Sequence, residues 1–394
     1  MHNPNGEIIW AQSIGGFGDD FGSDCSTDSQ GNIVLVGDYD CEKLNIGHYT
    51  FNNKTKRGEG SDIIIIKYSP DGKVNWAKSI GGAKHDGQYV TCAIDKEENI
   101  YITGQFYSDK FMIDSLELSK SKKRGADVFL AKFSSNGKLL WAKSSHGPDT
   151  FGSETQSCGV DAKGNIIISG LFDGPFIAFD TDSLKVNAEK SNRIFVAKYS
   201  STGKLIWANS YGGTVATSRV DGDGNIFLAG AFADSVLSIG STKLYNKGDG
   251  NLLIAKLNPE GKVLWAKSAG GEGFVGVRNF CIDPKGNAII TGTFNSPIWT
   301  LGNTTLTKDT TSFTTKHEKR TEDMFIASYS KNGDVLWAKC AGGKGRNAGR
   351  SCVADKNGNI YWTGSFDVNK LTLGSLTLTN SGDSDIFIIK LSPR

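Results

Sequence analysis

Asp62-Ile-Ile-Ile-Ile-Lys-Tyr-Ser-Pro-Asp-Gly-Lys-Val-Asn-Trp-Ala77 is the stretch of sequence that decides the fold. Residues 63–68 have the aliphatic and aromatic side chains of a strand, and the turn residues Ser-Pro-Asp-Gly follow at 69–72. Trp76 marks a second strand, so the stretch predicts a β-hairpin. The opening residue stands 14 positions before the tryptophan, and the same spacing starts again at Asp127, Arg193, Asn251 and Asp323.

Tryptophan reveals that this hairpin belongs to a repeat. Six tryptophans recur at intervals of 66, 65, 66, 58 and 72 residues, at Trp10, Trp76, Trp141, Trp207, Trp265 and Trp337. A second block of sequence recurs once in each repeat. It begins with an Asp each time, at Asp28, Asp95, Asp161, Asp221, Asp283 and Asp355. An Asn follows four residues later, a Gly five after that, and an aromatic residue two further on. The Asp-to-Asn segment predicts a tight hairpin turn, and the later Gly predicts a β-bulge or a close backbone approach.

Each repeat therefore predicts four antiparallel strands. The first strand ends at the turn Asp, the second runs from the Asn to the aromatic residue, the third opens the quoted hairpin, and the fourth carries the tryptophan. Six such repeats predict an all-β fold, a six-bladed β-propeller of four-stranded antiparallel blades. A solenoid is the competing repeat architecture, but it leaves both chain ends unexplained. The last repeat stops after its third strand, whereas residues 5–10 resemble a fourth strand alone.

We therefore expect residues 6–12 to pair with residues 385–391, so that the N-terminal strand completes the C-terminal blade and closes the ring. The prediction is one domain over residues 1–394. Its blades span residues 17–81, 82–146, 147–212, 213–270, 271–342, and 343–394 together with 5–14. Because both ends coincide with repeat boundaries, we expect a domain excised from a longer protein that carried a secretion signal.

Two motifs carry a resemblance to a known family. They are Asp-x-x-Gly-Asn-Ile-Tyr-x-Thr-Gly-x-Phe at 355–366 and the stretch 62–77 quoted above. With them the chain resembles the bacterial β-propeller-repeat proteins, often called seven-bladed propeller repeats, that occur in cell-surface proteins. The resemblance covers the whole chain, although the number of repeats is six rather than seven. It implies a propeller and a location outside the cell or on its surface, but no activity, because propellers have many unrelated functions.

Composition excludes several classes of protein. Hydrophobic residues make up 38% and charged residues 22% of the chain, as in a globular protein. A net charge of +2 provides no basic surface for nucleic acid. The longest aliphatic run is residues 63–66, far short of the ~20 apolar residues of a membrane helix. We therefore expect a monomer with neither a nucleic-acid partner nor membrane insertion, and the N-terminus shows no signal peptide.

Segments that resemble catalytic, cofactor or metal motifs have structural explanations in this sequence. Seven cysteines leave at least one unpaired, and none forms a Cys-x-x-Cys motif. Five recur near the end of the first strand, where small buried side chains are favoured over a metal-binding ring: Cys25, Cys92, Cys158, Cys281 and Cys352. Residues 271–276 match Gly-x-Gly-x-x-Gly without the helix that a dinucleotide site needs. Residues 221–225 resemble half a calcium loop that lacks its Glu. We expect no cofactor and no metal.

Connection lengths separate two ends of each blade. The turns between first and second and between third and fourth strands keep a fixed spacing, whereas the other connections vary. We call the end with the variable connections the variable face and the other the tight-turn face. Binding residues usually lie on variable loops of a rigid scaffold, so we place function on the variable face. Its second-to-third connections predict small hairpins, as at 237–244, 301–306 and 371–378, and residues 308–320 form a polar insertion.

Polar side chains in the fourth-to-first connections, near the expected axis, are the candidate ligand-binding residues. They are Asp20, Asp24, His85, Asp86, Tyr89, Glu154, Arg219, Arg278, Asn279, Arg346 and Arg350. Ordinary loop polarity is the simpler explanation of such residues. The early repeats contribute acidic residues and the later ones arginines, which favours an asymmetric mouth for a polar ligand. We predict a noncatalytic binding or structural module of a bacterial surface or secreted protein that recognises a glycan or protein partner.

A second class of function stays open. A propeller-type glycan lyase or hydrolase needs paired carboxylates at the mouth of the central channel. Asp20, Asp86 and Glu154 stand in adjacent repeats and provide candidates for such a pair, although no sequence motif assembles them.

Overall fold

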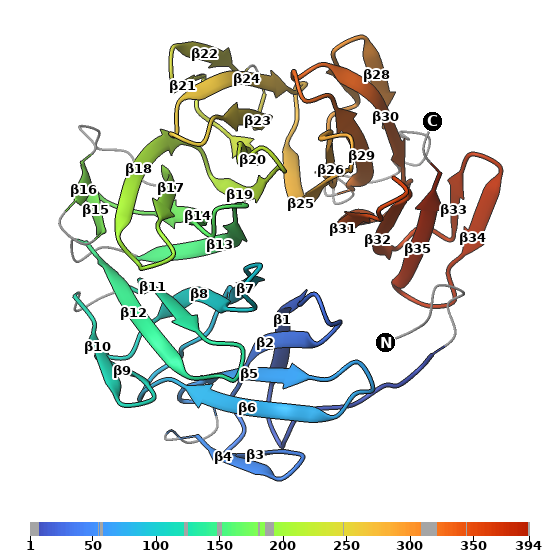
Figure 1. Ribbon diagram of the computed structural model, residues 1–394. Coiled ribbons are helices and arrows are strands. Elements are labelled where there is room, and N and C mark those ends of the chain that lie inside the picture. The colour runs from blue at the N-terminus through green and yellow to red at the C-terminus, as the bar shows by residue number, and fades with distance from the viewer. Residues whose placement is uncertain are drawn as a thin grey trace. The chain divides into compact units, whose positions relative to one another are not determined.

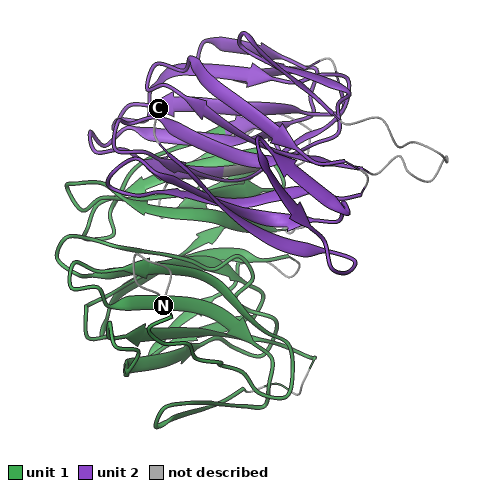
Figure 2. Ribbon diagram, turned by 90° about the vertical axis from the view of Figure 1, so that its right-hand side faces the viewer, with its two compact units in different colours: residues 1–210 green, residues 211–394 purple. Residues whose placement is uncertain are grey.

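A computed structural model describes residues 8–53, 55, 58–121, 125–147, 152–179, 182–185, 193–246, 248–308, 321–343 and 345–392. In these residues the chain forms strands β1 to β35 and no helix. The chain divides into two compact units, residues 1–210 (unit 1) and residues 211–394 (unit 2), as coloured in Figure 2. The boundary falls within one strand, β18 (Leu205–Gly212). The predicted all-β class is confirmed, with six propeller blades, three built in each half of the chain.

Unit 1 contains the first three blades (Figure 1). The first blade has the order β1 (Asp20–Thr27), β2 (Ile33–Tyr39), β5 (Asp62–Tyr68), β6 (Val74–Ile80). The second has β7 (Thr91–Ile94), β8 (Ile100–Phe106), β11 (Asp127–Phe133), β12 (Leu139–His146). The third has β13 (Ser153–Val160), β14 (Ile166–Phe172), β17 (Arg193–Tyr199) and β18.

Unit 2 contains the remaining blades. The fourth has the order β19 (Val215–Val220), β20 (Ile226–Phe232), β23 (Asn251–Leu257), β24 (Val263–Ala269). The fifth has β25 (Val275–Ile282), β26 (Ala288–Phe294), β29 (Asp323–Tyr329), β30 (Val335–Ala341). The sixth has three described strands, β31 (Ala348–Ala354), β32 (Ile360–Phe366) and β35 (Asp385–Leu391). This is the predicted order of first, second, third and fourth strands.

A small hairpin joins the second and third strands of every blade. The six hairpins are β3 (Lys43–Ile46) with β4 (Tyr49–Asn52), β9 (Lys110–Ile113) with β10 (Leu116–Ser119), β15 (Phe176–Phe179) with β16 (Asp182–Lys185), β21 (Val236–Ile239) with β22 (Thr242–Tyr245), β27 (Ile298–Leu301) with β28 (Thr304–Thr307), and β33 (Lys370–Leu373) with β34 (Leu376–Thr379). The predicted hairpins at 237–244, 301–306 and 371–378 are thus confirmed. The polar insertion falls at 309–320, outside the described residues.

Burial follows the repeat. The aromatic residues that end the second strands are each at most 1% exposed: Tyr39, Phe106, Phe172, Phe232, Phe294 and Phe366. Phe106 packs on Phe111 of the hairpin with ring centroids 4.8 Å apart, and Phe111 packs on Phe129 at 4.9 Å. The aromatic residue of the second strand therefore packs beneath the hairpin, and these buried rings are unavailable for stacking on a sugar.

Side chains and backbone of the tight turns agree with the sequence prediction. The Oδ1 atom of Asp28 accepts a hydrogen bond from the backbone N–H of Asn32 at 2.8 Å, and the Asn32 side chain donates to Oδ2 at 2.8 Å. Gly31 has φ 81° and Gly72, in the other turn, has φ 84°, a conformation that glycine adopts without steric cost. The Asp therefore fixes the turn by bonding its own backbone.

Tryptophans of the fourth strands bind the next blade within each unit. Trp76 Nε1 donates to the Ser135 carbonyl oxygen at 3.1 Å, and Trp265 Nε1 donates to the Lys331 carbonyl oxygen at 3.1 Å. Both acceptors lie in the third-to-fourth turn of the following blade. Tryptophan thus connects neighbouring blades in these pairs.

Hairpins provide a second connection between consecutive blades. β15 of the third blade pairs with β12, the fourth strand of the second blade, through Ser145 opposite Phe179 (Figure 1). Single antiparallel bridges join Gly81 to Met112 in unit 1 and Gly270 to Thr300 in unit 2. These three hairpins thus cover the outer edge strand of the blade before them.

The N-terminal segment makes the contacts of a fourth strand on its neighbour. Trp10 Nε1 donates to the Pro70 carbonyl oxygen at 2.9 Å, and the Trp10 ring lies 5.7 Å from that of Tyr68. Gln12 donates to the Gly72 carbonyl oxygen at 2.6 Å. The predicted pairing of residues 6–12 with β35 involves residues 1–7, which lie outside the described residues, and it joins the two units. It stays a prediction.

Candidate functional site

The structure places seven of the predicted site residues in first strands rather than in loops. These are Asp20 and Asp24 in β1, Glu154 in β13, Arg219 in β19, Arg278 and Asn279 in β25, and Arg350 in β31. The other four, His85, Asp86, Tyr89 and Arg346, lie in fourth-to-first connections as expected. First strands of consecutive blades lie next to one another within each unit. The candidate residues of a unit therefore belong to neighbouring strands and connections.

Three predicted arginines of unit 2 meet at one cavity of about 540 Å³. Its lining consists of Arg278, Asn295, Glu322, Arg346, Ala348, Arg350, Ser365, Asp367 and Ser384. We call it the arginine pocket. It lies between the fifth and sixth blades on their variable face, because its lining residues lie in or just before first strands, at or just after the ends of second strands, or just before third strands. All three arginine side chains are exposed.

Two β-bulges place arginine at this pocket. The pairing of β25 with β26 shifts between Val277 and Asn279, so Arg278 is the extra residue, and the pairing of β31 with β32 shifts at Arg350 in the same way. The second-strand glycine makes each bulge possible. A Cβ on Gly292 would lie 1.9 Å from the Gly276 carbonyl oxygen, which is too close for any larger residue. The sequence predicted either a β-bulge or a close backbone approach at this glycine, and the structure shows both. The bulge changes the direction in which the inserted side chain points.

Backbone contacts fix the third arginine. Arg346 forms a parallel bridge with Glu322, and its N–H donates to Asp367 Oδ2 at 3.0 Å. The next residue, Asn347, is fully buried. Its N–H donates to the Glu322 carbonyl oxygen at 2.8 Å, and its side-chain oxygen accepts from the Asp367 N–H at 3.2 Å. Asn347 therefore anchors the loop, which leaves the Arg346 side chain at the rim.

Arg219 and Asn279 connect first strands to each other. Arg219 donates to Asn279 Oδ1 at 2.9 Å, and Asn279 donates from Nδ2 to Ser351 Oγ at 3.2 Å. Arg219 also donates to the Ser218 carbonyl oxygen at 2.9 Å and lies 5.5 Å from the centre of the Phe280 ring. These contacts give Arg219 and Asn279 a structural role within unit 2.

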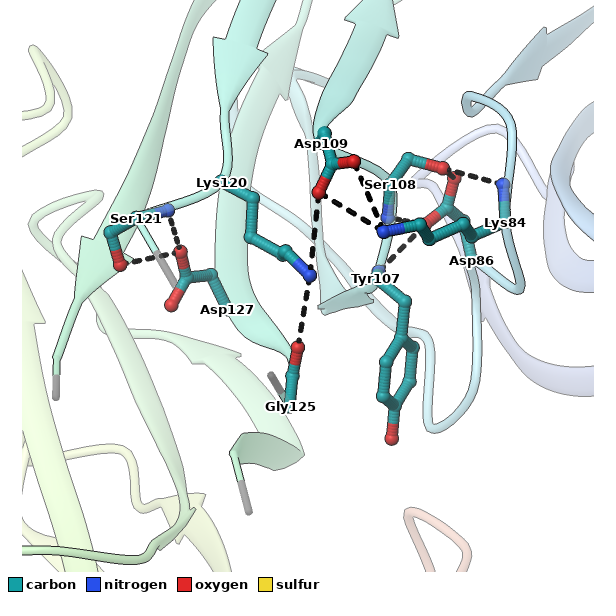
Figure 3. Close-up of polar contacts among 9 residues, drawn as sticks. All are labelled: Lys84, Asp86, Tyr107, Ser108, Asp109, Lys120, Ser121, Gly125 and Asp127. Atoms are coloured by element: carbon teal, nitrogen blue, oxygen red, sulfur yellow. Dashed lines mark hydrogen bonds and ion pairs between the residues drawn. The ribbon is translucent and has the colours of Figure 1, made fainter. Parts of the chain in front are cut away.

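In unit 1, Asp86 is fully buried. Its Oδ1 atom accepts from the N–H groups of Tyr107 at 2.8 Å and Ser108 at 3.0 Å, and Oδ2 accepts from Ser108 Oγ at 2.6 Å (Figure 3). Burial raises the pKa of Asp86, and the hydrogen bonds from Ser108 and Tyr107 oppose this rise. The neighbouring His85 is exposed and bridges Ser61 through its backbone. Asp86 thus organises the loop rather than facing solvent.

Acidic residues gather on the first blade. Burial raises the pKa of Asp38 in β2 to about 6, and the charges of Asp20 and Asp40 raise it further. Asp20 accepts a hydrogen bond from the Gly16 N–H at 2.7 Å. Asp24 instead bonds the N–H of Cys92 in the next first strand at 3.0 Å. Among the described residues, no group of three or more His, Cys, Asp and Glu side chains has the arrangement of a metal site.

A larger cavity of about 640 Å³ lies on the tight-turn face of unit 2, next to Trp337, Lys285 and Lys339. Leu391 and Ser392, the last described residues, bound it. Its walls therefore continue into residues outside the described part of the chain. The arginine pocket has a complete described lining and is the better candidate.

Sequence reasoning missed a buried ion pair in the tight turns. Lys67 Nζ lies 2.9 Å from the turn Asp28, and Lys198–Asp161 and Lys256–Asp221 repeat this distance. Burial opposes ionisation of Asp28, but the bonds from Lys67 and Asn32 outweigh it and hold the pKa at about 2. The signal was present, because a Lys stands five residues after the start of five third strands.

Six residues of the pocket lining were also missed, among them Asn295, Glu322 and Asp367. Asn295 and Asp367 directly follow the buried aromatic residue of their second strands, and Glu322 directly precedes a third strand. These repeat positions could have identified them.

The cysteines are all free thiols, and Cys41, Cys92 and Cys352 are buried. Within the described part of the chain, no helix has the length and hydropathy to cross a membrane.

Comparison with known proteins supports the repeat assignment. The chain is 22% identical, over 92% of its length, to an uncharacterised WD repeat-containing protein, L264, of Acanthamoeba polyphaga mimivirus. The chain is built from β-propeller repeats. These propeller repeats correspond to only 30% of the mimivirus protein. No family model matches the chain.

Solved structures with some likeness are distant. A protein of unknown function from Dyadobacter fermentans is 9% identical with a TM-score of 0.44, and 95% of each chain is covered. A protein of unknown function from Bacteroides caccae is 14% identical with a TM-score of 0.31, covering 67% of this chain and 69% of that one. The V. cholerae biofilm matrix protein Bap1 is 12% identical with a TM-score of 0.19, covering 94% and 69%.

Proposed function

We propose that the chain is a noncatalytic binding module whose arginine pocket holds the acidic group of a glycan. The observation that carries the proposal is the meeting of Arg278, Arg346 and Arg350 at one cavity of about 540 Å³. Ligand pockets of proteins span ~300–1,000 Å³. A guanidinium group presents a planar fork of N–H donors that matches a carboxylate.

The charges of the pocket favour an anion. Three arginines face two carboxylates, those of Glu322 and Asp367, which leaves the lining with one net positive charge. In the part of the chain that the structure describes, none of the three guanidinium groups forms an ion pair with a carboxylate. Their donors are therefore available to a ligand. Charge-assisted hydrogen bonds of this kind are about twice as strong as neutral ones.

The lining favours a glycan over a protein. Apart from Ala348, every residue of the pocket is polar or charged. Protein–protein hot spots are rich in Arg and in the aromatic residues Trp and Tyr, and the arginine pocket has the arginines but no aromatic residue. The hydroxyl-bearing ring of a uronic acid fits side chains such as Asn295 and Ser365 while its carboxylate meets the arginines.

Isothermal titration calorimetry with polygalacturonate, dextran and poly-glutamate tests this function. We expect polygalacturonate to bind, salt to weaken its binding, and neutral dextran not to displace it. Arg278→Ala and Arg350→Ala should each weaken binding about tenfold, or ~1.4 kcal/mol. Lys262→Ala, which removes an exposed cation on the tight-turn face, is the matched control. Binding of poly-glutamate alone would favour a protein partner, and equal affinities of all variants would exclude the pocket.

The location that we propose is outside the cell or on the surface of a bacterium, with the module acting as a monomer. The resemblance of the repeats to those of cell-surface proteins supports this location. Detection of the protein on intact cells or in the culture medium tests it, and sedimentation at micromolar concentration tests the monomer.

An enzyme is the second candidate, and one observation favours it. Burial and the charges of Asp20 and Asp40 raise the pKa of Asp38 to about 6, and a carboxyl group with a raised pKa is what the general acid of a glycosidase requires. The buried Asp86 has its carboxylate bonded to the loop. Release of reducing ends from the same polysaccharides, lost in Asp20→Asn, would establish a glycan lyase or hydrolase and replace the noncatalytic function.

A further inference from the structure

We propose that Tyr89, Tyr107 and Glu154 form a separate site in unit 1 that binds an uncharged sugar unit. The site lies at the junction of the second and third blades, on the variable face. It does not depend on the arginine pocket, which is built entirely from residues of unit 2. Three features of these residues lead to the proposal.

The first feature is the backbone of Tyr89. Nine positions separate the buried Asp86 from the turn Asp95, whereas eight separate its counterpart Asn347 from Asp355. The second blade therefore accommodates one extra residue, and Tyr89 adopts φ 56°. This left-handed conformation is unfavourable for a residue with a side chain. Burial does not compensate for it, because Tyr89 is 52% exposed. Strain of this kind concentrates at binding sites.

The second feature is the way that Tyr89 is tied to the third blade. Thr155 Oγ1 donates to the Tyr89 carbonyl oxygen at 3.4 Å, which brings the loop next to β13. The adjacent residue Glu154 is half-buried, and Gln156 Nε2 donates to its Oε1 atom at 2.9 Å. A second carboxylate oxygen stays available for a hydroxyl group. The tyrosine ring and the carboxylate thus belong to one surface region.

The third feature is the orientation of Tyr107. Asp86 holds its backbone N–H, while the phenol ring points away from that network (Figure 3). Gln105 Nε2 donates to Gln88 Oε1 at 3.0 Å, so the loop that carries Tyr89 lies against the end of β8 that precedes Tyr107. Burial raises the pKa of Tyr107, and the charge of Glu154 raises it further. In the described part of the chain, the Tyr107 hydroxyl makes no hydrogen bond within the protein. The loop thus presents a fixed ring to the same region.

The chemistry of this group fits a neutral sugar. The apolar face of a pyranose packs on a tyrosine ring, and its hydroxyl groups donate to a carboxylate and exchange hydrogen bonds with an amide. An acidic sugar fits poorly, because Glu154 repels it and the two nearby lysines, Lys84 and Lys120, are engaged. Lys84 and Lys120 are both paired with Asp109, at 3.1 Å and 3.6 Å.

Saturation-transfer difference NMR on the full chain tests the site with four neutral hexasaccharides: maltohexaose, cellohexaose, mannohexaose and xylohexaose. We expect at least one to bind. Tyr107→Ala and Glu154→Gln should each weaken it at least fivefold. Tyr245→Ala, which removes another exposed tyrosine (62%), is the matched control and should bind as the parent does.

Tyr89→Gly separates a binding role from a structural one. Glycine suits the left-handed conformation, so the variant should unfold at a higher temperature than the parent and yet lose binding at least fivefold. Arg278→Ala should leave the neutral saccharide unaffected, which distinguishes this site from the arginine pocket. The proposal is overturned if no neutral hexasaccharide binds, or if Tyr89→Gly binds as tightly as the parent.

Discussion

The junction of the first two blades in unit 1 and the junction of the last two blades in unit 2 share one backbone plan. Ser61 bridges His85 in the first, and Glu322 bridges Arg346 in the second. The residue that follows the bridge donates its N–H to the carbonyl oxygen of Ser61 or Glu322, at 2.8 Å in both cases. The same backbone geometry therefore presents histidine at the junction in unit 1 and arginine at the junction in unit 2.

The anchor residue differs in charge between these junctions. Asp86 binds three donors of residues 107 and 108, whereas the neutral Asn347 binds one N–H of Asp367 and donates its amide to the Glu322 carbonyl oxygen at 3.2 Å. The scaffold thus tolerates different side chains at equivalent positions. Specificity can then be set separately in each unit, which suits an acidic ligand in one and a neutral ligand in the other.

The largest expected effect is on the anchors. Asp86→Ala leaves three buried donors without an acceptor, and we expect a loss of about 3 kcal/mol in the free energy of unfolding. Asn347→Ala should cost about 1–2 kcal/mol, and Asp86→Asn, which copies the sixth blade, about 1 kcal/mol. Urea denaturation measures all three variants. Equal losses for the two alanine variants would show that the charge of Asp86 contributes nothing.

The next effect concerns tryptophans with matching roles. Trp10→Ala and Trp265→Ala each remove a half-buried ring and a hydrogen bond to a turn carbonyl, so each should cost about 2–3 kcal/mol. Deletion of residues 1–12 should cost at least as much as Trp10→Ala, since it also removes the bond of Gln12 to Gly72. If the truncated chain melts at the temperature of the parent, the predicted closure of the sixth blade by this segment is wrong.

A smaller effect is a pH dependence of stability, which we expect from a residue of unit 1 and not from its equivalent in unit 2. The folded-state pKa of Asp38 is about 6, raised from 3.8, so the folded chain keeps this proton longer than the unfolded chain. The contribution of the Asp38 carboxyl group to the free energy of unfolding therefore falls as pH rises from about 4 to about 6. Asp38→Asn should gain about 1 kcal/mol at pH 7 and nothing at pH 3. The equivalent residue of unit 2, Ser365, has no charge, and Ser365→Ala should show no such pH dependence.

The smallest effect is expected at the arginine pocket. Arg278→Ala and Arg350→Ala should change the free energy of unfolding by no more than ~0.5 kcal/mol, because both side chains are exposed. Arg219→Ala, by contrast, breaks the bonds to Asn279 and Ser218 and should cost about 1–2 kcal/mol. Thermal unfolding of the three variants provides the comparison. A large loss for Arg278→Ala would assign it a structural role instead of a ligand-binding one.

Much of the fold is predictable from single positions in the repeat. The turn Asp, the buried aromatic residue and the bulge-forming glycine each act locally or on the next strand, so their spacing predicts their contacts. The site is less predictable. His85 and Asp86 are neighbours in sequence, yet one is exposed and the other buried. The difference depends on Tyr107 and Ser108, which the hairpin connection brings to the loop.

The arginine pocket shows why the remainder could not be predicted. Arg278 and Arg346 are 68 positions apart, and only the packing of the fifth blade on the sixth brings them to one cavity. Spacing placed both on the variable face but gave no measure of their separation. The role of Arg219 was hidden for the same reason, because its partner Asn279 belongs to another blade.

The hairpin that covers the preceding blade has a consequence for synthesis on the ribosome. The outer strand β12 meets β15 through Ser145 and Phe179, so it stays uncovered until the third blade has begun to emerge. Domains fold from the N-terminus during translation, and each new hairpin then shields the edge left by the blade before it. The nascent chain within a unit would thus expose one open edge strand at a time, which limits association between neighbouring polysome chains.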